Sequence, residues 1–199
     1  AFFNRVQKLA KTPLLVGVRV TSGRNEQLRV TILVNHLRSL IDVDSATNGA
    51  RVRAKRAGQA EFVAGLVARR LAGDPQEHIL VLGDLNAFEF NDGYVDTVGT
   101  IGGAPAPRDQ VVLATRDLVE PDLTDLIGLL PDLERYSYVL DGTAQALDHM
   151  LVTEALRSHV SLFTYVRGNA DSPEVWRNDM RRPERISDHD AALAYLKLP

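Results

Sequence analysis

Two neighbouring segments, residues 14–20 and residues 28–34, alternate apolar with polar positions and are rich in β-branched side chains. An alternation with a period of two is typical of strands that bury one face. The turn-forming residues 21–25 lie between them and favour a tight connection. We therefore expect a β-hairpin whose second strand leads directly into Asn35 and His36.

The pattern changes over residues 52–71, which carry apolar residues at the three- and four-residue spacing of one helix face. Gly73-Asp74-Pro75 then stops the predicted helix. Residues 79–82 form a short, wholly apolar run that ends in Gly83-Asp84-Leu85-Asn86. Such a run indicates a buried central strand with polar residues at its mouth.

The later pattern completes a mixed fold. Residues 99–109 contain several glycines and prolines, so we expect a loop there. The further elements expected are a short helix at residues 123–130, strands at residues 136–140, 146–152, 158–165 and 191–198, and a turn at Asp141-Gly142. We find no internal repeat and no linker. The 199 residues, 45% of them hydrophobic, suit one packed core, so residues 1–199 are expected to form a single α/β domain.

Composition removes several classes of protein. No apolar run approaches the roughly 20 residues that cross a bilayer, so no membrane span is expected. The absence of cysteine excludes disulfides and thiolate metal ligands, although it does not decide the compartment.

The net charge of −3 argues against a broad basic surface for nucleic acid, but not against an enzyme that contacts a few phosphates. Two local basic clusters stand out, and we interpret both as mainly solvated faces. They are Arg51, Arg53, Lys55 and Arg56, and Arg177, Arg181, Arg182 and Arg185.

Polar residues recur where the apolar runs end. They are Asn35-His36, Asp84 with Asn86, Asp148-His149, and Ser187-Asp188-His189. Carboxylates, amides and imidazoles that converge at one rim of a sheet suit an oxygen-ligated cation and a phosphoryl group. An imidazole becomes an effective base near neutral pH when a carboxylate orients it. We therefore expect Asp148 to lie beside His189.

Each of these residues taken alone also has an ordinary structural explanation. An aspartate at a strand end is commonly a turn or cap residue, and a lone histidine is commonly hydrogen-bonded within the fold. We interpret His78 and His159 as structural or surface residues and assign a structural role to His149.

Taken in order, the motifs resemble the endonuclease/exonuclease/phosphatase superfamily, and most closely its bacterial extracellular-nuclease-like branch. The resemblance rests on Val34-Asn35-His36-Leu37-Arg38-Ser39, Arg56 with Gln59-Ala60, Gly83-Asp84-Leu85-Asn86-Ala87, Tyr136-Ser137-Tyr138-Val139 before Leu147-Asp148-His149, and Ser187-Asp188-His189-Asp190. It implies a two-layered β-sandwich flanked by helices, as in deoxyribonucleases, and a metal-dependent nuclease.

The resemblance also implies a role for each matching residue. The catalytic residues would be His36 at the leaving oxygen, Asp84 at the water or metal, Asn86 at the phosphate, Asp148 as the orienting carboxylate and His189 as the general base. Asp188 and Asp84 would hold the metal. Asn35, Asn86 and Arg56 would bind substrate, with structural packing left open as an alternative for Arg56. The metal would be Mg²⁺, with Mn²⁺ or Ca²⁺ as substitutes, and the substrate nucleic acid, DNA in preference to RNA. Secretion is implied by the resemblance alone.

The chain departs from the family pattern at its start. The family begins with an Asn-containing strand and a metal-binding Glu, and Phe2-Phe3-Asn4-Arg5 resembles the strand that follows that Glu. Glu26 and Glu61 stand in the wrong order to replace it. We therefore expect the N-terminal strands of the sandwich and one metal ligand to be missing.

Two other functions remain open at this point. One is a phosphatase or a lipid or inositol-phosphate phosphodiesterase built on the same core, because a fold does not choose its leaving group. The other is a non-catalytic module that keeps the motifs but lacks the Glu.

Overall fold

A computed structural model describes residues 12–21, 27–177 and 179–198 of the protein. Within these residues, five strands form a mixed central sheet in the order β1-β2-β3-β7-β4. The strands are β1 (Leu14–Thr21), β2 (Gln27–His36), β3 (Ile79–Asp84), β7 (Asp148–Val152) and β4 (Thr124–Asp125). Only β2 and β3 run parallel; the other neighbouring pairs are antiparallel.

The predicted hairpin is confirmed, since β1 and β2 pair in continuous register from Leu14 opposite Val34 to Thr21 opposite Gln27. The predicted turn at 22–25, the strand-like segment at 2–5 and Glu26 lie outside the described residues.

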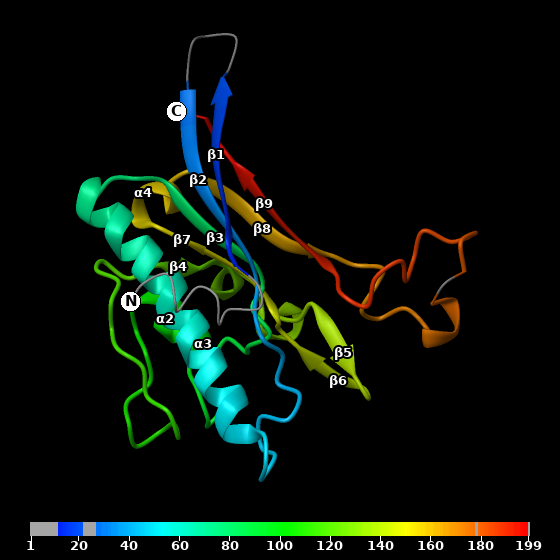
Figure 1. The fold of residues 1–199 in the computed structure, drawn as a ribbon. Coiled ribbons are helices and arrows are strands. Elements are labelled where there is room, and N and C mark those ends of the chain that lie inside the picture. Colours follow the sequence, from blue (N-terminus) through cyan, green and yellow to red (C-terminus); the bar gives the residue numbers. More distant parts are fainter. Residues whose placement is uncertain (1–11, 22–26, 178, 199) are drawn as a thin grey trace.

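Helices cover one face of the sheet (Figure 1). The predicted long helix is α2 (Gly49–Gly73), and it packs with α3 (Thr97–Gly102) against sheet residues such as Leu33, Val81 and Leu151. The prediction of a loop from residue 99 onward was wrong for the part that forms α3. The side chain of Asp96 caps this helix at Gly99 N, and burial stabilises a segment whose glycines give little helical propensity.

The opposite face of the sheet carries a second, two-stranded layer. Strands β8 (Val160–Val166) and β9 (Ala191–Leu196) pair antiparallel, and Phe163 of β8 belongs to a core cluster with Leu28, Leu80 and Val152 of the central sheet. Sheets packed face to face, with helices outside one of them, are the α/β arrangement that the sequence predicts.

The remaining elements are short. They are η1 (Leu126–Leu129), η2 (Asp132–Glu134), β5 (Tyr138–Leu140), β6 (Thr143–Gln145), α4 (Glu154–Arg157) and η3 (Glu174–Trp176). The prediction of a helix at 123–130 was therefore wrong in part. This segment contains the two-residue strand β4, followed by the 3-10 helix η1. Asp141 and Gly142 form the predicted turn between β5 and β6, both with positive φ. No helix of the described segments is long and apolar enough to cross a membrane.

Candidate active site

One row of residues across the central sheet carries three of the predicted catalytic side chains. His36 ends β2 opposite Asp84 of β3, and Asp84 lies opposite Asp148, the first residue of β7. Directly paired residues on neighbouring strands lie about 5 Å apart with their side chains on the same face. The register alone therefore brings these three groups together at the carboxyl edge of β2 and β3.

Gly83 makes the close approach of β2 and β3 possible at this edge. Its φ is +128°, and a Cβ atom at this position would lie 2.0 Å from the carbonyl oxygen of Asn35. Only glycine avoids both the strain and the clash. The first letter of the Gly-Asp-x-Asn motif is thus a backbone requirement that delivers Asp84 to the site.

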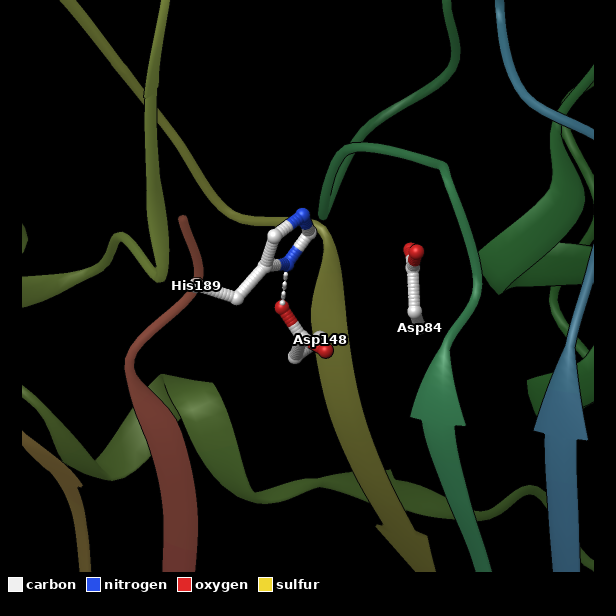
Figure 2. Close-up of side chains that lie close together, drawn as sticks. All are labelled: Asp84, Asp148 and His189. Atoms are coloured by element: carbon white, nitrogen blue, oxygen red, sulfur yellow. Dashed lines mark hydrogen bonds and ion pairs between the residues drawn. The ribbon is translucent and has the colours of Figure 1, made fainter. Parts of the chain in front are cut away.

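Asp148 orients His189, as the sequence predicts. The Oδ2 atom of Asp148 accepts a hydrogen bond from Nδ1 of His189 at 2.6 Å and another from the hydroxyl of Ser137 at 2.7 Å. The imidazole also packs on the ring of Tyr138, with 4.7 Å between the ring centroids. Because Nδ1 carries the proton that Asp148 accepts, Nε2 of His189 is the nitrogen that is free to act as a base (Figure 2).

Electrostatics at the site favour the charged form of His189. The hydrogen bond to Asp148 raises the pKa of His189, burial opposes that shift, and the charges of Asp148, Asp84 and Asp188 reinforce it. A base with a raised pKa is a stronger proton acceptor at the pH where it is neutral.

Asp84 lies beside the Asp148–His189 pair and is hydrogen-bonded by Asn86. Its carboxylate accepts hydrogen bonds from the backbone nitrogen of Asn86 at 2.8 Å and from the side-chain Nδ2 of Asn86 at 3.0 Å. Nε2 of His36 lies 3.4 Å from Asp84 Oδ2. Burial raises the pKa of Asp84, the Asn86 N–H lowers it, and the nearby charge of Asp148 raises it. A cation bound to this carboxylate would offset the cost of burying its negative charge and the repulsion from Asp148.

The donor atoms fit a hard divalent cation. Asp84, Asp148 and His189 each offer one ligand atom, and these atoms lie within 4.8 Å of one another. Carboxylate oxygens are the ligands that Mg²⁺, Mn²⁺ and Ca²⁺ prefer. Because the bond between Asp148 Oδ2 and His189 Nδ1 already occupies both atoms, Asp84 is the member of the group best placed to hold the cation.

Asp188 is not brought into this group. Its side chain is 42% exposed, and its carboxylate faces Arg177 Nη2 at 4.0 Å. It acts on the site through its charge, which contributes to the raised pKa of His189. Its role as a metal ligand stays a prediction.

Arg56 lies beneath the site, and its side chain does not reach the surface at which substrate contact was predicted. Its side chain is 1% exposed and donates to the carbonyl oxygens of Arg38 and Asn86, both at 2.7 Å. It also forms an ion pair with Asp92 at 3.0 Å and donates to the hydroxyl of Thr97 at 3.5 Å. The packing alternative is therefore correct for this geometry, because Arg56 ties together the loops that follow β2 and β3.

Asn35 also points away from the site. It is buried, and its Nδ2 donates to the carbonyl oxygens of Leu33 at 2.8 Å and Leu82 at 3.4 Å. Its predicted role in substrate binding has no counterpart in this arrangement, since successive residues of a strand face opposite sides of the sheet and His36 takes the exposed side.

The second basic cluster is largely neutralised within its own segment. The prediction of a solvated face holds for Arg177, Arg181 and Arg182, but it is wrong for Arg185, which is buried. The ion pairs are Arg177 with Glu174, Arg181 and Arg182 with Asp179, and Arg185 with Glu174.

Three further residues support the site, and none of them had a role predicted from the sequence. Ser137 holds Asp148, and Tyr138 supports the ring of His189. Both belong to the Tyr-Ser-Tyr block of the resemblance, so the signal was present without an assigned role. Asp125 is the third: it binds His149 Nδ1 at 2.7 Å, while His149 Nε2 binds the carbonyl oxygen of Ala87 at 2.8 Å. The structural role predicted for His149 is confirmed.

No protein-family model matches the chain, and no curated protein matches it by sequence. Among solved structures, the chain is similar to the Xenopus laevis APE2 catalytic domain, with 14% identity and a TM-score of 0.56 over 98% of this chain and 59% of that one. It is also similar to beta toxin from Staphylococcus aureus, with 15% identity, a TM-score of 0.51, and coverage of 93% and 57%. It is similar as well to an AP endonuclease from Archaeoglobus fulgidus, with 12% identity and a TM-score of 0.50 over 92% of this chain and 72% of that one.

These identities are low, so the similarity concerns the fold. The chain spans less than two thirds of the length of the first two structures. The central mixed sheet and the second β layer agree with that similarity. The chain therefore has a DNase I-like α/β fold.

Proposed function

We propose that the protein is a metal-dependent phosphodiester hydrolase that cleaves nucleic acid, DNA in preference to RNA, and that it belongs to the bacterial extracellular-nuclease-like branch. The observation that carries the proposal is the Asp148–His189 hydrogen bond beside Asp84. A base, its orienting carboxylate and a second carboxylate lie together there, and these are the groups that hydrolysis of a phosphodiester requires.

His189 acts as the general base in this proposal. Its Nε2 takes a proton from the attacking water, and the resulting imidazolium is stabilised by Asp148, which also keeps the proton on Nδ1 beforehand. Ser137 holds Asp148 in this orientation, because its hydroxyl donates to the same carboxylate oxygen that accepts from His189.

The phosphate is held by neutral and cationic groups. The Nδ2 of Asn86 donates to Asp84 and to the carbonyl oxygen of Leu37, so its amide is fixed at the mouth of β3. Both hydrogens of this amide are engaged, so one of these two bonds would give way when Asn86 donates to a non-bridging oxygen, and the neutral amide would add no negative charge there. His36, more than half exposed beside Asp84, is placed to protonate the leaving oxygen.

Asp84 would hold the metal ion. When bound, Mg²⁺ supplies positive charge to the non-bridging oxygens of the phosphate as a Lewis acid. Asn86 keeps the carboxylate of Asp84 in a fixed orientation through two hydrogen bonds.

The test is hydrolysis of DNA by the full-length protein with Mg²⁺. We expect cleavage that falls about 100-fold or more in His189→Ala, the range of a lost general base. His78→Ala is the matched control, because His78 lies at the opposite end of β3 next to Ile79 and should leave the rate unchanged. Intact DNA, or cleavage that persists in His189→Ala, would contradict the proposal. Parallel assays with RNA, sphingomyelin and an inositol phosphate separate a nuclease from the two other enzyme classes.

A further inference from the structure

A hollow of about 280 Å³ opens directly beside the catalytic row. His36, Asp84 and Asn86 line its catalytic side, and Arg38, Ser39 and Lys55 line the side that faces α2. The hollow thus continues the site in one direction, from the carboxylate of Asp84 toward two cationic side chains.

Lys55 is a cation without a partner. It projects from α2, is half-buried, and makes no hydrogen bond or ion pair with any residue that the structure describes. Most other cations near the site are engaged: Arg56 pairs with Asp92, and Arg38 donates to the carbonyl oxygen of Ile41 at 2.8 Å and to the hydroxyl of Ser39. The free ammonium group faces a space that a ligand can enter.

The wall of the hollow is fixed from below. The backbone nitrogen of Arg38 donates to Oε1 of Gln59 at 2.9 Å, and its carbonyl oxygen accepts from Arg56. Gln59 and Arg56 are both buried on α2, the helix that carries Lys55. The relative position of Lys55 and the β2 loop is therefore set by buried contacts, so the hollow is preorganised.

We infer that this hollow binds a second phosphate of the substrate, next to the one that is cleaved, and that Lys55 is its ion-pair partner. The inference rests on the proposed function and names its substrate class: a strand with successive phosphates, in preference to a diester with a single phosphate. Phosphates along one strand follow one another at about 3.4 Å of helix axis, so a neighbour of the cleaved phosphate lies within reach of an adjoining hollow. A compact, rotatable ammonium suits such a point contact.

The test compares two substrates in Lys55→Gln. For an oligonucleotide we expect KM to rise about 5- to 10-fold with little change in kcat, because one phosphate contact is lost from both the ground state and the transition state. For bis(4-nitrophenyl) phosphate, which has a single phosphate, kcat/KM should stay at the wild-type value. The salt slope of DNA binding, measured by fluorescence anisotropy with a chelator present, should fall by about 0.7 to 0.9.

Two variants control for charge and folding. Lys197→Gln removes the same charge at the far end of β9 and should change neither substrate. Lys55→Arg keeps the charge and should restore most of the affinity.

The possible outcomes separate the two claims. The second-phosphate site would be overturned if Lys55→Gln lowered kcat/KM equally for both substrates or left the KM for DNA unchanged. It would also be overturned if Lys197→Gln raised the KM for DNA as much as Lys55→Gln does. Cleavage of the small diester by the wild-type protein without any cleavage of nucleic acid would instead overturn the proposed function.

Discussion

Asp148 and His189, 41 residues apart in the chain, are joined by a hydrogen bond of 2.6 Å between the carboxylate Oδ2 and the ring Nδ1. The bond connects the first residue of β7 to the segment that leads into β9. It crosses from the central sheet to the second layer, so the base is positioned only when the two layers pack. Catalytic competence is thereby coupled to the core between them.

Replacing Asp148 by Asn should lower the pKa of His189, since the hydrogen bond to Asp148 is the largest cause of its raised value. The base must be neutral to act, so activity rises with pH through that pKa. We expect the acidic limb of the kcat/KM profile to move to lower pH, with kcat reduced about 100-fold or more. Ser137→Ala, which leaves the charge in place, should shift the limb much less. A pH–rate profile that keeps its acidic limb in Asp148→Asn would refute the pairing.

Removal of the metal should abolish activity without unfolding the protein. Chelation is expected to stop hydrolysis, and Mg²⁺ to restore it. Asp84→Asn should weaken Mg²⁺ binding about 10-fold or more, because the remaining donors of the group are already bonded to each other. Isothermal titration calorimetry measures the affinity, and Asp188→Asn tests the metal role predicted for Asp188 in the same assay.

Gly83→Ala should destabilise the fold through a clash as well as through backbone strain. The new Cβ would meet the carbonyl oxygen of Asn35 at 2.0 Å, so β2 and β3 would have to separate. We expect a loss of about 2 kcal/mol or more in urea unfolding. Gly142→Ala is the matched control: its φ is +80°, but no atom lies within 4 Å of the added Cβ, so strain alone should cost about 1 kcal/mol.

The substitution Arg56→Lys distinguishes a structural role of Arg56 from direct contact with the substrate. The ammonium group cannot replace the bonds of the buried guanidinium to Arg38, Asn86 and Asp92, so the free energy of unfolding should fall by about 3 kcal/mol. The salt slope of DNA binding should stay unchanged, since Arg56 does not reach the surface. A reduced slope with unchanged stability would show direct phosphate contact instead.

His149 should make the protein less stable as pH rises. Burial lowers its pKa, but the hydrogen bond and charge of Asp125 and the bond to Ala87 together raise it above 6.5. A raised folded pKa means that the contribution of His149 is complete below pH 6.5 and is lost as pH rises through the folded value. Urea unfolding at a series of pH values measures this slope, and His149→Gln should reduce it. Stability that instead increases over this range in the wild-type protein, with the slope unchanged in His149→Gln, would rule out this assignment.

The sequence by itself determined the elements that carry the site. The pattern of apolar residues predicts three strands, at residues 14–20, at residues 28–34 and in the apolar run before Gly83. All three strands form in the structure. The motif order was also enough to predict that Asp148 lies beside His189. Such features follow from residue type and spacing, because a strand such as β2 buries alternate apolar residues, whereas β1 forms with none of its residues buried.

The tertiary structure decided what each charged side chain does. The motif set Arg56 apart from Lys55, its neighbour on the same helix, but left open whether Arg56 packs or binds substrate. One is buried among carbonyl oxygens and Asp92, which come from the two loops that follow β2 and β3, whereas the other faces an open hollow. The helix α3 likewise forms only because α2 and the sheet bury it. Burial and partners depend on residues far apart in the chain, so these roles were fixed only when the layers packed.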